Sequence, residues 1–276
     1  MTLTQQQNNS GNSSAAYAAN ITTLLQTAKT AALEAGEAIL KVYTSGDAEV
    51  EVKADDSPLT KADRAAHEII ACHLAQTGLP ILSEEGKQTA FEQREKWPWH
   101  WLVDPLDGTK EFLKRNGEFT VNIALMHLNI PVGGVIYAPV LGALYVGSSA
   151  TGVYKETQGQ QTLLKPKPKR QELKELLQQP QVHIIASRTH LSPETAAFIS
   201  QFPNSQTVSM GSSLKFMLVA EGKADIYPRF APTMEWDTAA AHAILLTLNR
   251  GIYQQNLQHE LAYNKPNLLN PSFIAY

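Results

Sequence analysis

Two aspartates stand three residues apart in the segment WLVDPLDGTKEF, which spans residues 101–112. Asp104 and Asp107 follow an apolar run that predicts a β-strand, and Gly108, Thr109 and Lys110 come directly after them. Polar groups at the end of a strand are where α/β proteins gather the side chains that bind ligands. The segment therefore predicts a site with its own chemistry.

Five acidic residues stand out because three of them end predicted strands and two open predicted helices. The set is Asp63, Glu84, Asp104, Asp107 and Asp237. Carboxylate oxygens without nearby Cys or His pairs favour Mg²⁺ or Mn²⁺ over Zn²⁺. Several carboxylates at one point repel each other, and divalent cations would relieve that repulsion. Two such cations can clamp the attacking and the leaving oxygen of a phosphoryl transfer.

The residues after Asp107 supply a complementary part for an anion. Gly108 lets the backbone approach a ligand closely, and the amides of Gly108, Thr109 and Lys110 could open a helix and point at a phosphate. The Thr109 hydroxyl could orient a water molecule, with Asp63 as its hydrogen-bond partner. That arrangement would provide general-base chemistry.

Each acid also has a structural explanation when it is taken alone. Asp63 follows Thr60 at the spacing of a capping box, and Asp237 precedes a helical pattern, so either could be a helix cap. Glu84 with Glu85 could be a solvated turn. The pair at residues 104 and 107 is harder to explain in this way, because it abuts Gly-Thr at a strand end.

The periodicity of apolar residues predicts an α+β first half and an α/β second half, with a seam near residues 150–170. Amphipathic helices are expected from residue 20 onward and behind Thr60, and strands are expected at 79–84, 97–107 and 119–148. Strands and helices then alternate between residues 182 and 248. The run KPKPKR at residues 165–170 reads as an exposed basic connector.

Composition restricts the class of protein. The chain has 276 residues, 43% of them hydrophobic, and a formal net charge of −3, which gives no reason to expect binding to a nucleic acid polymer. A single cysteine, Cys72, excludes an internal disulfide and is expected to be a small buried residue. No apolar run reaches the ~20 residues of a transmembrane segment. The first 28 residues carry no charge, unlike a signal peptide, and residues 1–19 read as a disordered polar leader.

The motifs DPLDGT and WDTAAAHAI together resemble the two signatures of the inositol monophosphatase superfamily, whose members are lithium-sensitive, Mg²⁺-dependent phosphatases. LSEEG and SPLTKAD resemble the other acidic elements of that family, in the expected order, and the resemblance covers residues 20–276. It implies a layered αβαβα sandwich of the inositol monophosphatase and sugar phosphatase type. On this reading residues 20–155 form an α+β subdomain with the metal-binding acids, residues 156–276 form an α/β subdomain, and the two make one catalytic unit.

Within the superfamily, TKAD, DGTKEF and GSSLKF with YPRF resemble the 3′(2′),5′-bisphosphate nucleotidase branch of the CysQ type. Inositol phosphatases usually carry Thr-Asn where this chain has Lys110 and Glu111. The resemblance implies hydrolysis of adenosine 3′,5′-bisphosphate, a by-product of sulfate assimilation, with two or three Mg²⁺ ions and Mn²⁺ as an alternative. A small-molecule nucleotide substrate, a monomer or homodimer, and a cytoplasmic enzyme, free or at the inner face of the inner membrane, are expected.

The resemblance also assigns roles to positions of this chain. Its implied metal ligands are Glu84, Asp104, the Leu106 carbonyl, Asp107 and Asp237. Its implied catalytic residues are Asp63 and Thr109, which activate water, and Glu84. Its implied substrate-binding residues are Glu84, Asp107, Gly108, Thr109, Lys110, His190, Ser212, Lys215, Arg229 and Asp237.

Three alternatives stay open. An inositol or sugar phosphatase on the same scaffold would share the metal site and differ only on the nucleotide side, where Lys110, Lys215 and Arg229 favour the nucleotidase. Without the resemblance, Lys215 and Arg229 would be read as ordinary surface charges. A phosphatase with an aspartyl-phosphate intermediate is disfavoured, because its two aspartates stand two residues apart near the N-terminus. A non-catalytic metal or phosphate sensor would be expected to lack one of the five acids, and all five are present.

Overall fold

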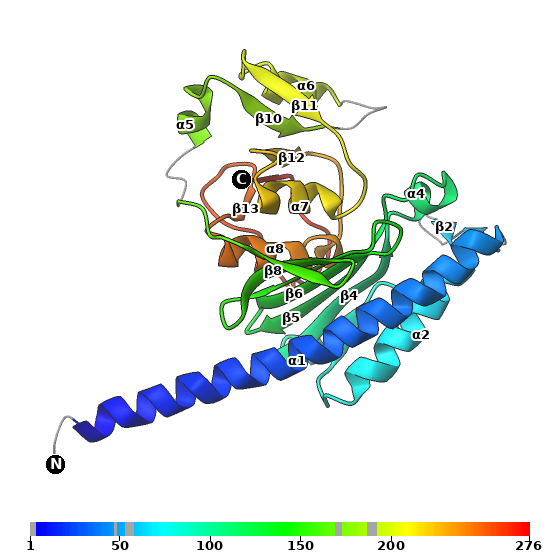
Figure 1. Ribbon diagram of the computed structural model, residues 1–276, viewed down its shortest axis with the longest axis vertical. Coiled ribbons are helices and arrows are strands. Elements are labelled where there is room, and N and C mark those ends of the chain that lie inside the picture. Colours follow the sequence, from blue (N-terminus) through cyan, green and yellow to red (C-terminus); the bar gives the residue numbers. More distant parts are fainter. Residues whose placement is uncertain (1–3, 47–48, 53–57, 169–172, 187–191) are drawn as a thin grey trace.

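The computed structural model describes residues 4–46, 49–52, 58–168, 173–186 and 192–276. His190 and residues 169–172 of the basic connector lie outside the described residues. Helices and sheets alternate in layers (Figure 1), which confirms the expected layered α+β arrangement. Within the described residues, no helix combines the length and the apolar character needed to cross a membrane.

A seven-stranded sheet forms the centre of the first part of the chain. Its strands lie in chain order, and only the first pair is parallel. They are β3 (Ile81–Ser83), β4 (Trp99–Asp107), β5 (Thr120–His127), β6 (Ile130–Ala138), β7 (Ala143–Ser148), β8 (Gly152–Thr157) and β9 (Gln160–Leu164). The expected boundary at 155/156 falls inside β8, because hairpin pairing continues the same sheet to Leu164.

Two long helices cover one face of this sheet (Figure 1). These are α1 (Thr4–Ser45) and α2 (Lys61–Ala75). Ile21, Leu25 and Ile39 of α1 are buried at helical spacing, so the helix docks by one apolar stripe. A short antiparallel pair, β1 (Glu51–Val52) and β2 (Pro58–Leu59), precedes α2.

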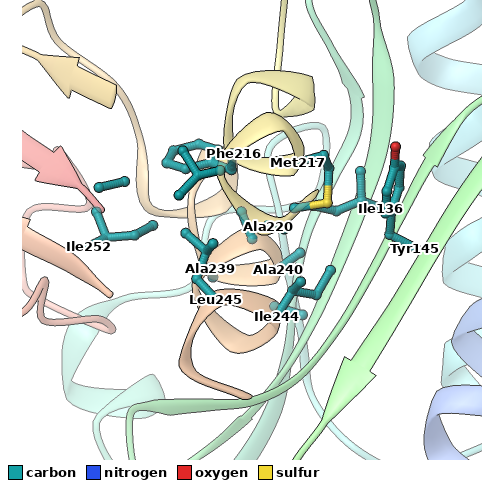
Figure 2. Packing of buried hydrophobic residues seen from close by; sticks show 14 of the residues in the cluster. Ile136, Tyr145, Phe216, Met217, Ala220, Ala239, Ala240, Ile244, Leu245 and Ile252 are labelled. Carbon is teal, nitrogen blue, oxygen red and sulfur yellow. The ribbon is translucent and has the colours of Figure 1, made fainter. Parts of the chain in front are cut away.

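A second helical layer lies on the opposite face of the sheet (Figure 1). It contains α7 (Leu214–Glu221) and α8 (Ala239–Thr247), and Figure 2 shows Met217, Ala240 and Ile244 on the side of these helices that faces Ile136 and Tyr145 of the sheet, with Phe216 on the other side of α7. Strand β6 admits helices on both faces because it carries adjacent glycines. A Cβ at Gly133 would lie 2.9 Å from Leu25 of α1, and a Cβ at Gly134 would lie 2.1 Å from the Ala240 carbonyl of α8.

The second half of the chain adds smaller sheets and helices beyond this layer (Figure 1). Strands β10 (Val182–Ile185) and β11 (Ser205–Val208) are parallel, and an antiparallel sheet has the order β12 (Tyr227–Arg229), β14 (Phe273–Ala275), β13 (Ile252–Gln254). The remaining helices are α3 (Phe91–Arg94), α4 (Thr109–Leu113), α5 (Leu173–Leu177), α6 (Pro193–Ile199) and the 3₁₀ turn η1 (Glu235–Asp237).

Two expectations differ from the structure. Helix α1 begins at Thr4, so residues 4–19 continue a helix where a disordered leader was expected. The packed turns from Ile21 onward supply the nucleus, and extending a helix from an existing nucleus through alanines 15, 16, 18 and 19 costs far less than starting one. Cys72, expected to be buried, is exposed because it lies on the outer face of α2.

His100 gives the fold a pH-dependent weak point. It is fully buried on β4, and its two ring nitrogens have no hydrogen-bond partner among the residues that the structure describes. Burial, with the nearby Arg94 guanidinium, lowers the pKa of His100 to about 4. The folded pKa lies below that of the unfolded chain, so stability is full above pH ~6.5 and falls as the pH drops toward 4.

The free energy of unfolding of the wild type should decrease in mild acid, and we expect this decrease to be smaller in His100→Leu. The difference between the two proteins in the free energy of unfolding, measured by urea titration, should change by about 2 kcal/mol between pH 8 and pH 5. Equal pH dependence in both proteins would contradict the assignment.

Candidate active site

The pairing of β3 with β4 brings the first two acids together. The two strands are parallel with Ser83 opposite Val103, and the Glu84 amide donates to the Val103 carbonyl at 3.1 Å. The carboxyl ends of the strands therefore coincide, and Glu84 emerges beside Asp104. This is the edge of an open sheet at which α/β proteins place ligands.

A β-bulge turns Asp104 and Asp107 to the same side. Side chains three positions apart in a regular strand point to opposite faces. Here Asp104 pairs with Asn122 while Asp107 pairs with Thr120, so β4 holds one residue more than β5 over this stretch. Pro105, which has no amide hydrogen, lies inside the bulge, and the Leu106 amide donates to Asp104 Oδ1 at 3.0 Å.

Two neutral side chains hold Asp107. The Ser213 hydroxyl lies 2.8 Å from Asp107 Oδ2 and 2.9 Å from the Asp237 carbonyl oxygen, and its one proton serves these two acceptors. The Asn122 amide donates to Ser213 Oγ at 2.9 Å and to Asp107 Oδ2 at 3.3 Å. Ser213 thus ties β4 to the turn that carries Asp237. Sequence reasoning missed both residues, although a polar side chain within the apolar strand FTVNIAL is a signal that could have found Asn122.

Asp63 combines the capping and the catalytic interpretations. The Thr60 amide and hydroxyl donate to Asp63 Oδ2 at 2.8 and 2.5 Å, and the Thr60 hydroxyl accepts from the amides of Ala62 and Asp63, so the predicted capping box is present. The other oxygen, Oδ1, accepts from the Thr109 hydroxyl at 3.3 Å. The cap therefore fixes a carboxylate that also orients Thr109.

The turn at Gly108, which is expected to approach a phosphate, packs tightly against residues 211–212. Gly108 precedes α4 with φ +96°, and a Cβ there would lie 3.2 Å from Ser212. A Cβ at Gly211 would lie 2.6 Å from the Glu118 carbonyl oxygen. Ser212 itself has a φ of 44°, a strained conformation for a residue with a side chain. Helix α4 does open at Thr109, as expected, whereas Lys110 is exposed on it.

The electrostatics of the acids show how close they lie. Burial, followed by the charges of Glu84 and Asp107, raises the pKa of Asp104 well above its usual range, and Asp237 and Asp63 add to the effect. Burial and then Asp107 raise the pKa of Asp237 to about 8, although the Met234 amide opposes this by donating to its carboxylate at 2.9 Å. The structure therefore collects the five predicted acids in one electrostatic neighbourhood that would favour a cation.

The donor set fits a hard divalent cation. In the described ranges of the chain, no three acidic, His or Cys side chains yet converge on a single point that could hold an ion. The hydrogen bonds to Asp107 and to Asp237 engage Oδ2 of each carboxylate, whereas both oxygens of Asp63 accept hydrogen bonds. The available ligands are carboxylate oxygens and the Leu106 carbonyl, and this oxygen set suits Mg²⁺ or Mn²⁺.

Two connected hollows extend from the acids. A cleft of about 70 Å³ is lined by Asp107, Asp237, Ser212, Lys215 and Arg229. Lys215, Arg229 and Tyr227 also line a wider cavity of about 330 Å³, whose other walls include Lys114, Ile185, Met210, Phe230 and the acids Glu111 and Glu118. The structure thus brings Lys215 and Arg229 to the acidic site, which sequence spacing alone could not establish.

Both cations are held with their charged ends at this cavity. Lys215 Nζ donates to the Ser212 carbonyl at 3.2 Å and lies 5.8 Å from the centre of the Tyr227 ring. Arg229 Nη2 donates to the Pro232 carbonyl at 3.3 Å, while its buried Nε has no partner among the described residues. Beside the acidic site, the cavity therefore offers two cationic groups on its wall, together with the acids Glu111 and Glu118.

Residues 20–269 match the Inositol monophosphatase family. This chain belongs to the inositol monophosphatase family. It is an enzyme, a phosphoric monoester hydrolase, and the resemblance inferred from DPLDGT and WDTAAAHAI is confirmed. Membership of this family implies metal-dependent catalysis, in keeping with the acid set.

The similar proteins include 3′(2′),5′-bisphosphate nucleotidases named CysQ. The protein from Salmonella typhimurium strain LT2 is 43% identical over 88% of this chain and 95% of its own length. The protein from Escherichia coli K12 is also 43% identical, over 88% of this chain and 95% of its own length. The crystal structure of CysQ from Bacteroides thetaiotaomicron superposes with a TM-score of 0.77 at 46% identity, covering 92% of this chain and 96% of the other.

If Ser213 orients Asp107 in this family member, then Ser213→Ala should weaken metal binding. Residues that hydrogen-bond to metal ligands typically contribute 10- to 100-fold in metal affinity or activity, so we expect a roughly tenfold or larger rise in the Mg²⁺ concentration for half-maximal phosphatase activity. The matched control is Ser148→Ala, another fully buried serine, which bonds Thr151 at a turn of the sheet. Equal Mg²⁺ requirements in the two variants would contradict this role.

Proposed function

We propose that the protein is a Mg²⁺-dependent 3′(2′),5′-bisphosphate nucleotidase that hydrolyses adenosine 3′,5′-bisphosphate to AMP and phosphate, as part of sulfate assimilation. The observation that carries the proposal is that Lys215 and Arg229 line both the cleft with Asp107 and Asp237 and the wider cavity beside it. A substrate with two phosphates needs an anion-binding group at a distance from the reacting centre. The names of the similar CysQ proteins support the same choice.

The substrate fits the charge and shape of the two hollows. The reacting 3′-phosphate would lie at the acids, and the ribose would occupy the cleft of about 70 Å³. The non-reacting 5′-phosphate would lie against Lys215 and Arg229, since a guanidinium can bind phosphate with two parallel hydrogen bonds. The base would then lie in the wider cavity near Ile185, Met210 and Phe230.

The residues proposed to hold Mg²⁺ are Glu84, Asp104, the Leu106 carbonyl, Asp107 and Asp237. When bound, the ions supply Lewis-acid chemistry that activates water and offsets the charge on the phosphoryl group. Both halves of the chain are needed, because Asp237 comes from the second half and the other ligands come from the first. We therefore propose that the two halves act as one catalytic unit.

The chain's own contribution to the reaction is to orient the nucleophile. Asp63 Oδ1 accepts the Thr109 hydroxyl proton at 3.3 Å, which directs the lone pairs of Thr109 Oγ toward a water molecule. Thr109 Oγ would accept a hydrogen bond from that water and so orient its oxygen toward the phosphorus. Gly108 leaves room for the phosphate oxygens, because a Cβ there would already crowd Ser212.

The test compares phosphate release from three substrates by the purified protein in Mg²⁺. They are adenosine 3′,5′-bisphosphate, adenosine 3′-monophosphate and inositol 1-phosphate. We expect a strong preference for the bisphosphate. A preference for inositol 1-phosphate would keep the metal site and overturn the proposed substrate.

Arg229→Met separates the roles of the two phosphates. A hydrogen bond to a charged group contributes about 1.5–3 kcal/mol, so KM for the bisphosphate should rise about 10- to 100-fold. KM for adenosine 3′-monophosphate, which lacks the second phosphate, should stay the same. Asp107→Asn is the control for the chemistry and should abolish release from every substrate. If Arg229→Met affected both nucleotides equally, Arg229 would not be the 5′-phosphate ligand.

A further inference from the structure

We propose that Glu235 is a positioning residue for Asp237. Its buried carboxylate, paired with Lys265, clamps the segment 263–270 around the turn 233–238 and so fixes the direction of the Asp237 side chain. The inference rests on the proposed function, because it takes Asp237 to be a metal ligand. Glu235 lies on η1, two residues before Asp237, yet its own side chain turns away to bind the C-terminal segment.

Glu235 is the acceptor at the centre of the clamp. Its side chain is 0% exposed, and it accepts from three donors of two consecutive residues. The Asn264 amide donates to Oε2 at 2.6 Å, while the Lys265 amide and the Lys265 ammonium donate to Oε1 at 3.1 and 2.5 Å. The bonds engage both carboxylate oxygens, so the side chain has little freedom to move.

Backbone hydrogen bonds carry the constraint from the clamp to the metal-ligand turn. The Glu235 amide donates to the Leu268 carbonyl at 2.9 Å, and the Asn270 amide donates to the Thr233 carbonyl at 2.8 Å. The Asn270 side chain donates to the Met234 carbonyl at 2.7 Å. The C-terminal segment therefore holds the turn at Thr233, Met234 and Glu235.

The position of Met234 then determines the position of the Asp237 carboxylate. The Met234 amide donates to Asp237 Oδ2 at 2.9 Å, and the Asp237 amide donates to the Met234 carbonyl at 3.2 Å. A displacement of Met234 would therefore move the carboxylate that it binds. Because metal ligands must be held within a fraction of an ångström, a small displacement is enough to weaken binding.

Arg94 links the same clamp to the other side of the acidic site. Its guanidinium donates to Asn264 Oδ1 at 2.7 Å and to the carbonyls of Lys265 and Pro266 at 2.5 and 3.0 Å. In return, the Asn264 side-chain amide donates to the Arg94 carbonyl at 2.8 Å. Arg94 ends α3, within the connection between β3 and β4 that also carries Glu84.

A cavity of about 450 Å³ lies between these parts. It is lined by Glu84 and Arg94 from the connection, Met234 and Trp236 from the turn, and Leu268 from the C-terminal segment, among others. Side chains do not fill the space between the two metal-ligand segments. Apolar packing alone therefore does not hold Glu84 and Asp237 in register, and the polar clamp provides a direct connection across the gap.

The charged nature of the clamp favours a positioning role over a purely stabilising one. Replacing a buried ion pair by well-packed apolar residues is often neutral or stabilising, so such pairs add little net stability. Their directional hydrogen bonds do define a geometry. A pair of this kind two residues from a metal ligand is best explained by the accuracy that metal binding requires.

The experiment compares Glu235→Gln with a matched control, Glu221→Gln. Glu221 is also a largely buried acid, with side-chain exposure of 9%, and it binds Lys155, Lys223 and the Tyr145 hydroxyl at the end of α7. These three partners all lie outside the turn 233–238 and outside the acids of the site. Both variants lose a buried charge, but only Glu235→Gln breaks the clamp.

Two readouts are measured on the full chain: Mg²⁺ affinity by isothermal titration calorimetry, and Tm in EDTA and in saturating Mg²⁺. We expect both variants to lower Tm in EDTA. Mg²⁺ affinity should fall about tenfold or more in Glu235→Gln, with a smaller rise of Tm on adding Mg²⁺, while Glu221→Gln should bind Mg²⁺ and gain Tm like the wild type. Equal Mg²⁺ affinity in Glu235→Gln and the wild type would overturn the proposal.

A milder variant, Lys265→Gln, covers the case in which Glu235→Gln does not fold. It keeps the Asn264 and Lys265 amide bonds to Glu235 and removes only the ammonium, so a smaller loss of Mg²⁺ affinity in the same direction is expected. Unchanged affinity there would likewise overturn the proposal. The wild type separates this inference from the proposed function: a wild type that binds no Mg²⁺ would refute both, whereas a wild type that binds Mg²⁺ with unaffected variants would refute only the positioning role.

Discussion

Mutual repulsion among buried carboxylates is the constraint on which the rest of this structure depends. Burial is the larger cause of the raised pKa values of Asp104 and Asp237, and the charges of the neighbouring acids raise them further. Neutral donors hold the acids in place: Thr60 for Asp63, Ser213 and Asn122 for Asp107, and the Met234 amide for Asp237. Neutral donors fix geometry without cancelling charge, so the neighbourhood stays attractive to a cation.

The same constraint explains why several different backbone features converge at the acidic site. A parallel strand pair aligns Glu84 with Asp104, a bulge turns Asp107 to the same side, and a capping box fixes Asp63. Each device is local and works through the backbone. Carboxylates that repel each other cannot hold each other in place. Each acid is instead positioned by its own part of the backbone. The C-terminal segment around η1 provides the equivalent device for Asp237.

The sequence predicted the parts of the site that depend on local chemistry. Acids at strand ends, the Thr60–Asp63 capping box and the helix opening at Thr109 all follow from short patterns, and the structure contains each of them. The role of Ser213 and the shared cleft of Lys215 and Arg229 with Asp107 and Asp237 depend on how distant segments dock, which no short pattern encodes. The only sign of the bulge in the sequence is Pro105, which lies between the two aspartates and is a residue that strands admit at bulges. The polar composition of residues 4–19 predicts disorder, whereas α1 begins at Thr4 because a helix propagates from turns that are already packed on the core.

The division of charge also separates the chemistry of the site from its specificity. The carboxylates interact with any phosphate ester through the cations they would bind, so they cannot distinguish one leaving group from another. Discrimination must come from groups that touch the remainder of the substrate, and we propose Lys215 on α7 and Arg229 on β12 for this role. Ser213, which bonds Asp107, precedes α7 directly, so the helix that carries Lys215 begins at the residue that orients a proposed metal ligand. On the proposed assignment, this short segment helps to set the distance between the reacting phosphate and the second anion, so a substrate with the wrong spacing between its phosphates would not satisfy both ends.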